Sequence, residues 1–137
     1  MFAVESPIIT HLQADPSLAG WAVRSGAQET SRRPMPAIEI VCEHAEVEDA
    51  RAGGVMVSVM WGVYLVAPYE ASVMASLDRA FGAAVAALHN WSPGVIEGRA
   101  WSPLKLTKVG RPEIAEQGLV AYSLIFHTTA LYKGQGA

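Results

Sequence analysis

Four histidines are the first residues in this sequence that could do chemistry, either as metal ligands or as general bases. They stand at His11, His44, His89 and His127, and no two of them are four residues apart. A helical zinc site needs a pair at that spacing, so we expect no metal centre and no other cofactor. His11 and His89 fall near the ends of two expected helices, where the helix dipole favours a positive charge. His127 lies within the last expected strand, where a hydrogen-bonded or interface role is more common than catalysis.

Cys42 and His44 have the residue types of a nucleophile and its base. Alternate residues of a strand point the same way, but that position alone does not activate a thiol, and the surrounding sequence offers no basic environment. A buried free cysteine usually packs as a small hydrophobic residue. We therefore assign no catalytic residue, and a small dimeric α+β enzyme that uses this pair stays an alternative.

Acidic residues that could hold a divalent cation gather between positions 43 and 49: Glu43, Glu46, Glu48 and Asp49. They lack the alternating Asp/Asn pattern and central glycine of a calcium loop, so the tip of a solvated hairpin is the better interpretation. The glycines are too sparse for a phosphate cradle, and no serine stands in a nucleophile elbow. The aromatic residues have no basic track beside them, so we expect no specific nucleic-acid binding.

The composition is typical of a compact protein that keeps some apolar side chains on its surface. Its 137 residues suffice for one domain, residues 1–137, with 51% hydrophobic and 17% charged residues. A typical domain has about 25% charged residues, so we expect apolar surface to remain after folding. The net charge is −3 and the longest basic run is Arg32-Arg33, which argues against a duplex-binding face. We expect a chain that is cytoplasmic when made and does not span a membrane, because it has a single cysteine, no apolar run of about 18 residues and a start unlike a signal peptide.

The elements that must position these residues follow from periodicity and turn signals. A helix is expected to start with Ser6 as N-cap and Pro7 as its first residue, and to stop at Asp15-Pro16. The patterns then predict strands at Trp21–Arg24, Ala37–Glu46, Val55–Val66, Leu104–Lys108 and Gly118–Tyr132, of which the first is short and Leu104–Lys108 is an edge strand. They predict a second helix at Ser72–His89. The expected connections are a loop at Ser25–Pro36, a hairpin connection at Glu48–Gly54 that is longer than a two-residue turn, and a turn or loop at Gly110–Glu113.

The strand Val55–Val66 is apolar on both faces, which is typical of strands that are covered on both sides. We expect the helix Ser72–His89 to cover one face, which carries Val57, Val59, Trp61 and Val63. The helix would do so through the stripe Met74, Leu77, Phe81, Val85 and Leu88. The other face carries Met56, Met60 and Tyr64. The predicted fold is α+β, with a mixed, mostly antiparallel sheet of four to five strands and two helices, the longer one packed on one sheet face.

Five segments carry a family resemblance that extends over nearly the whole chain. They are the opening Val4–Ile9, the strand entry Pro34–Ile38, the long-strand segment Trp61–Val66, the helix end Leu88–Pro93 and the terminal strand segment Gly118–Thr128. Taken together, this pattern resembles the small tail-terminator, or tail-completion, proteins of tailed bacteriophages, especially the Mu-type family. The motifs are diffuse and include no catalytic signature.

The resemblance implies a structural, non-enzymatic protein. Members of this family form a hexameric ring that caps the completed tail tube, stops its polymerisation and offers a docking surface to the neck or head connector. The implied partners are further copies of the chain, the tail tube protein, the neck or head-connector protein and, in contractile tails, the sheath protein. The implied location is the tail–neck junction of the virion, after assembly in the host bacterial cytoplasm, in a ring through which DNA can pass. Another phage neck or tail adaptor is the alternative, and it differs only in its partner.

The resemblance fixes no interface positions, so the candidate contacts rest on local chemistry. We expect contacts from the sheet face that the helix leaves open, from the charged hairpin and from the loop after position 110. The candidates are Met56, Met60, Tyr64, Glu46, Glu48, Asp49, Arg51, Arg111, Glu113 and Glu116.

Overall fold

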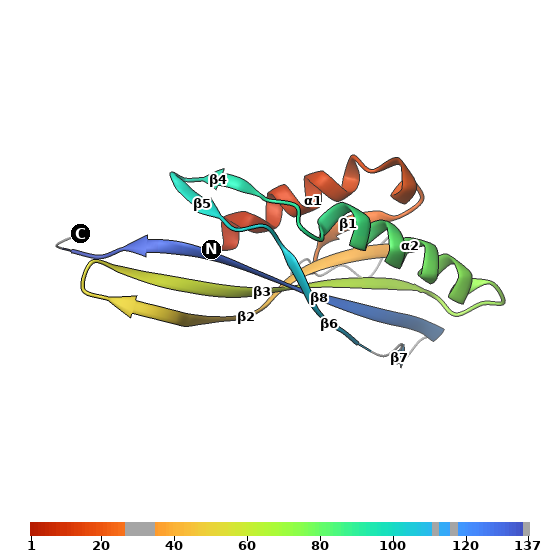
Figure 1. Ribbon diagram of the computed structural model, residues 1–137. Coiled ribbons are helices and arrows are strands. Elements are labelled where there is room, and N and C mark those ends of the chain that lie inside the picture. The colour runs from red at the N-terminus through yellow and green to blue at the C-terminus, as the bar shows by residue number, and fades with distance from the viewer. Residues whose placement is uncertain (27–34, 111–112, 116–117, 136–137) are drawn as a thin grey trace.

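The computed structural model describes residues 1–26, 35–110, 113–115 and 118–135, and its centre is one sheet of eight strands (Figure 1). The strands are β1 (Ala22–Ser25), β2 (Ala37–Arg51), β3 (Gly54–Pro68), β4 (Gly94–Ile96), β5 (Arg99–Trp101), β6 (Lys105–Val109), β7 (Glu113–Ala115) and β8 (Leu119–Lys133). The helical elements are α1 (Glu5–Gln13), α2 (Val73–Leu88) and the 3₁₀ turns η1 (Phe2–Val4) and η2 (Pro16–Leu18). The predicted α+β class with two helices is confirmed.

The sheet is mixed and mostly antiparallel, as predicted. Its order is β1-β2-β3-β8-β5-β4, and β6 and β7 also pair with β8. Among the described strands only β1 and β2 run parallel. The expected count of four to five strands was wrong, because β4, β5 and β7 have three residues each. Strands that short cannot display a period of two in the sequence.

The hairpin of β2 and β3 is the longest unit of the sheet. Each strand has 15 residues, and the register runs from Ala37 opposite Val66 to Arg51 opposite Gly54. The connection is therefore the pair of residues 52–53, and the longer connection expected from Glu48 onward was wrong. The second half of β2 is largely exposed on both faces, so it needs no alternation of apolar and polar residues. The sequence of this half therefore lacks the pattern by which a strand is predicted.

β8 lies in the interior of the sheet and is paired on both edges. β3 accompanies it along its full length, from Leu119 opposite Pro68 to Lys133 opposite Gly54. On the other edge β7, β6 and β5 follow one another, each antiparallel to β8. Residues far apart in the chain therefore meet on this strand.

Both helices lie on the same face of the sheet (Figure 1). α1 contacts β1 and β2, while α2 contacts β3. Under them β3 buries Val59, Trp61, Val63 and Leu65 completely, and Val57 is partly buried. The helix therefore covers the face for which it was predicted, and this burial of apolar surface is the main force that holds the layers together.

α1 starts two residues earlier than predicted, at Glu5 instead of Pro7. The turn η1 runs directly into the helix, so Val4 precedes its first residue and Ser6 lies within the first turn instead of capping it. The helix ends at Gln13, just before the predicted stop. The carboxylate of Asp15 then accepts a hydrogen bond from the backbone N–H of Ser17 at 2.9 Å, which caps η2.

The side chains that α2 turns to the sheet are smaller than its sequence suggested. Its buried residues are Val73, Leu77, Ala80, Ala84 and Leu88. Met74, a member of the predicted stripe, is 54% exposed, and Phe81 packs edge-on against Tyr122 of β8. The alanines let the helix approach the sheet closely, so the bulky residues are displaced to its flanks. No helix in the described part of the chain is long and apolar enough to cross a membrane.

Candidate functional site

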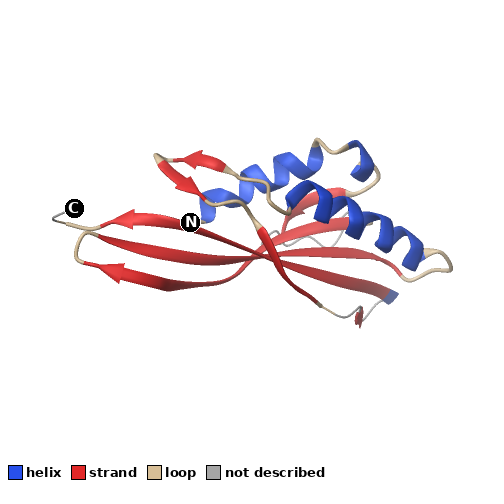
Figure 2. Ribbon diagram, viewed as in Figure 1, coloured by secondary structure: helices blue, strands red, loops and turns tan. Residues whose placement is uncertain are grey.

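The face of the sheet that points away from α1 and α2 is here called the outer face, and no described helix packs on it (Figure 2). β3 supplies its central row: Met56, Ser58, Met60, Gly62 and Tyr64. The register places residues of β2 and β8 beside this row: His44, Glu46, Ile125, His127 and Leu131. Met56, Met60 and Tyr64, all predicted contact residues, are partly exposed on it.

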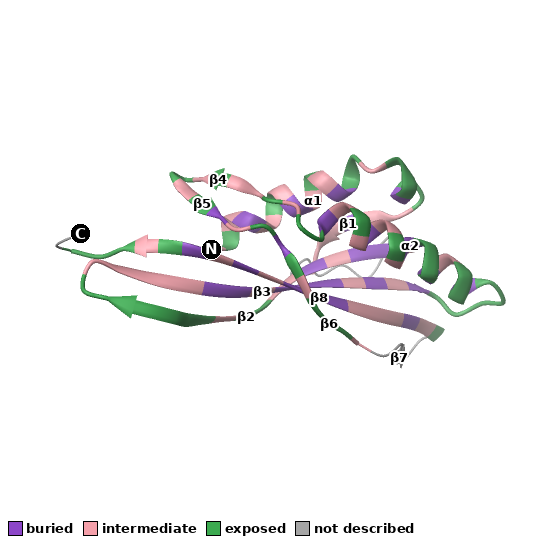
Figure 3. Cartoon of the chain, in the orientation of Figure 1, coloured by how far each residue is buried: buried purple, intermediate pink, exposed green. Residues whose placement is uncertain are grey.

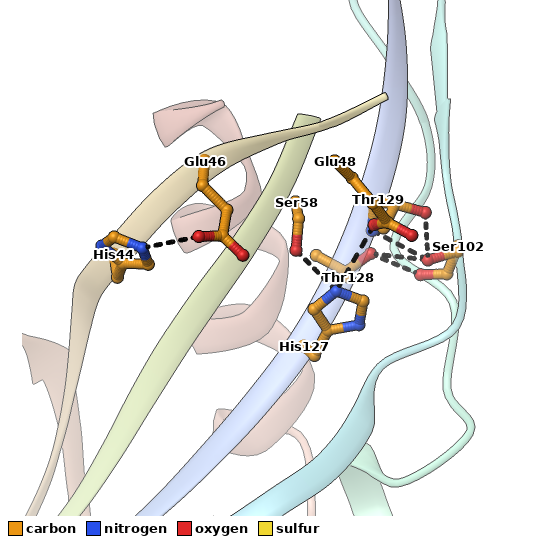
Figure 4. A network of polar contacts seen from close by, with 8 residues as sticks. All are labelled: His44, Glu46, Glu48, Ser58, Ser102, His127, Thr128 and Thr129. Carbon is orange, nitrogen blue, oxygen red and sulfur yellow. Dashed lines mark hydrogen bonds and ion pairs between the residues drawn. The ribbon is translucent and has the colours of Figure 1, made fainter. Parts of the chain in front are cut away.

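The middle of the outer face holds a serine–histidine pair that the sequence did not reveal. Ser58 is 4% exposed, and its Oγ lies 2.6 Å from Nε2 of His127 (Figure 4). A carboxylate oxygen of Glu48 lies 3.9 Å from the same nitrogen. In a catalytic triad the serine and the acid occupy different ring nitrogens. This arrangement therefore satisfies a buried hydroxyl and does not activate it; the pair is 69 residues apart in the chain, so no spacing could have predicted it.

Ion pairs and hydrogen bonds order the acidic side chains of β2. Glu46 lies 3.2 Å from Nε2 of His44 (Figure 4), and Asp49 lies 3.3 Å from Nε of Arg51. Glu43 accepts a hydrogen bond from the hydroxyl of Tyr64. All five of these β2 side chains are exposed, so the pairs contribute little to stability. They leave the hairpin charged and accessible.

A β-bulge separates the two residues of the candidate nucleophilic pair. The register shifts between Cys42 and His44, so Cys42 pairs with Trp61 and points toward the helices, whereas His44 pairs with Met60 and points outward. The expectation that both point the same way was wrong. Burial raises the pKa of the Cys42 thiol, and the nearby carboxylate of Glu43 raises it further. A thiol in this environment is a poor nucleophile at neutral pH.

Two open grooves lie on the outer face. The larger, about 670 Å³, extends from β2 across β3 and β8 to β6, and its lining includes Glu43, His44, Met60, Ile125 and Lys108. The smaller, about 460 Å³, lies at the hairpin tip and is lined by Asp49, Arg51, Gly53, Gly54, Met56 and Leu131. Mixed apolar and charged linings in open grooves are more typical of protein contacts than of cofactor pockets.

A third hollow, about 580 Å³, lies where the two helices end, and its histidines have structural partners. The ring of His11 stacks on Trp91 at 4.2 Å, and its Nε2 donates to the carbonyl of Ala87 at 2.9 Å. Nδ1 of His89 accepts the backbone N–H of Leu106 at 3.1 Å. Both imidazoles join a helix end to a neighbouring segment.

Ser102 connects β8 to the chain between β5 and β6 (Figure 4). Its Oγ accepts the backbone N–H of Thr129 at 2.9 Å, and its own N–H donates to the carbonyl of Thr129 at 2.9 Å. Its carbonyl accepts the hydroxyl of the fully buried Thr128 at 2.7 Å. One serine thus supplies the bonds that a continuous strand would have made along this edge.

The remaining predicted residues are spread over the hairpin and the far edge of β8. Glu46, Glu48, Asp49 and Arg51 lie on the exposed half of β2. Glu113 opens β7 opposite Ala121, whereas Arg111 and Glu116 lie outside the described residues. Within the described ranges, no three side chains of His, Cys, Asp or Glu converge to hold a metal ion.

Comparison with known proteins adds a likeness of fold. No protein-family model and no curated protein sequence matches the chain. Among solved structures, the fold is similar to that of a chain in the virion of a native gene transfer agent particle. The TM-score is 0.68, and the match covers 95% of this chain and 94% of that chain at 18% sequence identity.

Proposed function

We propose that the protein is a structural, non-enzymatic subunit of a tailed bacteriophage or a phage-like particle. The observation that carries the proposal is the near end-to-end similarity of its fold to a chain in a gene transfer agent virion. The separation of Cys42 from His44 by a bulge supports the same reading, because it removes the best candidate for an enzyme site.

Within such a particle, we propose the role of tail terminator, for which the sequence pattern has a Mu-type resemblance. Six copies would form a ring that caps the tail tube, stops its polymerisation and docks the neck or head connector. The tail tube protein, the connector and, in a contractile tail, the sheath protein would be its partners at the tail–neck junction.

The open sheet face supports a role in assembly. A subunit of a closed ring needs contact surfaces for two neighbours and further surfaces for the tube and the connector. The outer face leaves apolar side chains partly exposed beside charged ones, among them Met56, Met60 and Leu131. Apolar side chains that stay partly exposed together on one sheet face are typical of an interaction site. We therefore assign the outer face, with Tyr64 and the hairpin acids, to contacts with other virion proteins.

Electron microscopy of the purified protein tests this function, first alone and then mixed with the tail tube protein of the same particle. We expect rings with a central hole, and tubes whose length stops increasing once a ring caps one end. Tubes that grow unchanged, with no ring in either sample, would rule out the terminator role. Rings that bind a connector but leave tube growth unaffected would favour the adaptor role.

A further inference from the structure

In the second half of β2, one edge of the sheet is open within the described part of the chain. β1 pairs with β2 only from Ala37 to Ile40, and within the described ranges no strand pairs with the outer edge of β2 from Val41 to Arg51. Figure 3 shows this half of the strand exposed. Natural proteins protect such edges from uncontrolled pairing with charged residues and bulges, and β2 has both. Its edge is therefore open to a partner that complements its charge.

The charge of this edge is strongly negative. Val41–Arg51, here called the acidic arm, contains four acidic residues and one arginine, which gives 1 − 4 = −3. Each of its four carboxylate side chains is exposed. Within the arm only Arg51 offsets them, next to Asp49. A partner surface that matches this arm must be basic.

The far edge of the same sheet carries the opposite charge. Arg99–Val109, here called the basic edge, contains three basic residues and no acidic one, a charge of +3. Lys105 and Lys108 are exposed on β6, and no described carboxylate pairs with either. Lys105 donates instead to the amide oxygen of Asn90 at 2.6 Å, and Arg99 lies 3.5 Å from the ring centre of Tyr132. Neither contact neutralises the cation.

The topology places these two surfaces so that one copy can meet the next. β3 and β8 lie between β2 and β6, so the acidic arm and the basic edge are at opposite edges of the sheet. A second copy placed beside the first can then present its basic edge to the first copy's acidic arm. A contact between two different surfaces repeats from copy to copy and closes into a ring if the rotation between copies allows it.

We propose that a second copy of this chain binds the acidic arm through its basic edge, and that this head-to-tail contact joins neighbours in the ring. The proposal rests on the ring-forming function proposed above and specifies its subunit interface. A second copy is favoured as the partner because the same chain carries both an acidic and a basic edge. Side-chain pairs such as Glu46 and Glu48 with Lys105 and Lys108 form the contact.

Charge reversal on each surface tests the contact. One variant carries Glu46→Lys and Glu48→Lys, and the other carries Lys105→Glu and Lys108→Glu. A control carries Glu70→Lys and Asp78→Lys, which are exposed positions outside both surfaces and change the net charge as much as the first variant does. Circular dichroism and thermal unfolding establish that each variant is folded, and ring formation is measured by mass photometry and electron microscopy.

We expect each reversed variant alone to need about 100-fold more protein for ring formation than the wild type or the control, because like charges then face each other. An equimolar mixture of the two reversed variants should regain rings, since every contact between alternating copies again joins opposite charges. Folded variants that form rings as the wild type does, or a mixture that does not recover, would overturn the contact and leave the ring function standing. A wild type that forms no ring, alone or on tubes, would instead overturn the function and the contact together.

Discussion

Cys42 and His44 are two positions apart in β2, yet their side chains lie on opposite faces of the sheet. The extra residue of the bulge, Glu43, reverses the alternation between them. The thiol packs toward Trp61 and the helices, and the imidazole stands outside next to Met60. A pattern that suggests a nucleophile and its base is thereby divided between the core and the surface.

The partly buried position of Cys42 predicts a thiol whose pKa is raised above the ordinary value for cysteine. We expect the rate of alkylation by iodoacetamide to rise with pH at a higher apparent pKa in the folded protein than in the same protein unfolded in urea. Burial and the carboxylate of Glu43 both disfavour the thiolate. As the pH rises, the thiol ionises at a lower pH in the unfolded chain than in the folded protein. Its contribution to the free energy of unfolding is therefore present at neutral pH and is lost as the pH rises through the pKa of the folded state. Identical profiles in both states would contradict this account.

Two neighbouring positions of α2 should differ sharply in their effect on stability. Leu77 is buried against the sheet, whereas Met74 is 54% exposed. Leu77→Ala should lower the free energy of unfolding by about 2–5 kcal/mol, because it leaves a cavity in the core. Met74→Ala should change it by less than about 0.5 kcal/mol. Urea unfolding of both variants measures the difference, and a larger loss for Met74→Ala would mean that the helix faces the sheet differently.

Ser102→Ala should destabilise the fold without altering its surface. The substitution removes the acceptor for the backbone N–H of Thr129 and leaves that group partly buried without its bond. The expected cost is about 1–3 kcal/mol in urea unfolding. Thr107→Ala is the matched control, since the exposed hydroxyl of Thr107 also bonds a β8 carbonyl, that of Ile125 at 3.2 Å. The control should cost less, and equal losses would argue against a special role for Ser102.

The helices and the long strands were largely predictable, because each presents a clear apolar face. Alternating valines and Trp61 predict the strand β3, and Leu77 and Leu88 at helical spacing predict α2. The stripe predicted for α2 was wrong at Met74, because Ala80 and Ala84 let the helix approach the sheet closely and Met74 is left exposed. The exposed half of β2 and the three-residue strands had no such signal. The Ser58–His127 pair joins two neighbouring strands that are far apart in the sequence, so only the register of the sheet could reveal it.

Ring assembly through oppositely charged edges predicts a strong dependence on salt. Raising the salt concentration from about 0.05 M to about 1 M shortens the screening length from more than 10 Å to about 3 Å. We expect rings of the wild type to dissociate over this range at fixed protein concentration, as followed by sedimentation velocity. Thermal unfolding of the monomer serves as a control and should move little. Rings that persist unchanged at high salt would indicate a contact built mainly from apolar surface.

The apolar side chains at the hairpin tip should affect partner binding more than folding. Met56 and Leu131 line the small groove there, and Leu131 is 49% exposed. Leu131→Ser should leave the free energy of unfolding within about 0.5 kcal/mol of the wild type. The same change should weaken binding to the tube or to a neighbouring copy if the outer face is a contact surface. Unchanged affinity in titrations with tube protein would remove the hairpin tip from the interface.

The placement of β8 has a consequence for the order of events during synthesis. The sheet has its long strand β3 on one side of β8 and the strands β5, β6 and β7 on the other. All of these strands are translated before β8, and their backbone groups on the edge that faces β8 have no strand partner until β8 is made. The nascent chain thus cannot close its sheet until residues 119–133 have left the ribosome, and folding depends on contacts between distant parts of the chain, which makes it slow. Until then the edge of β3 that β8 later covers is exposed to other chains, which makes the incomplete chain prone to aggregation.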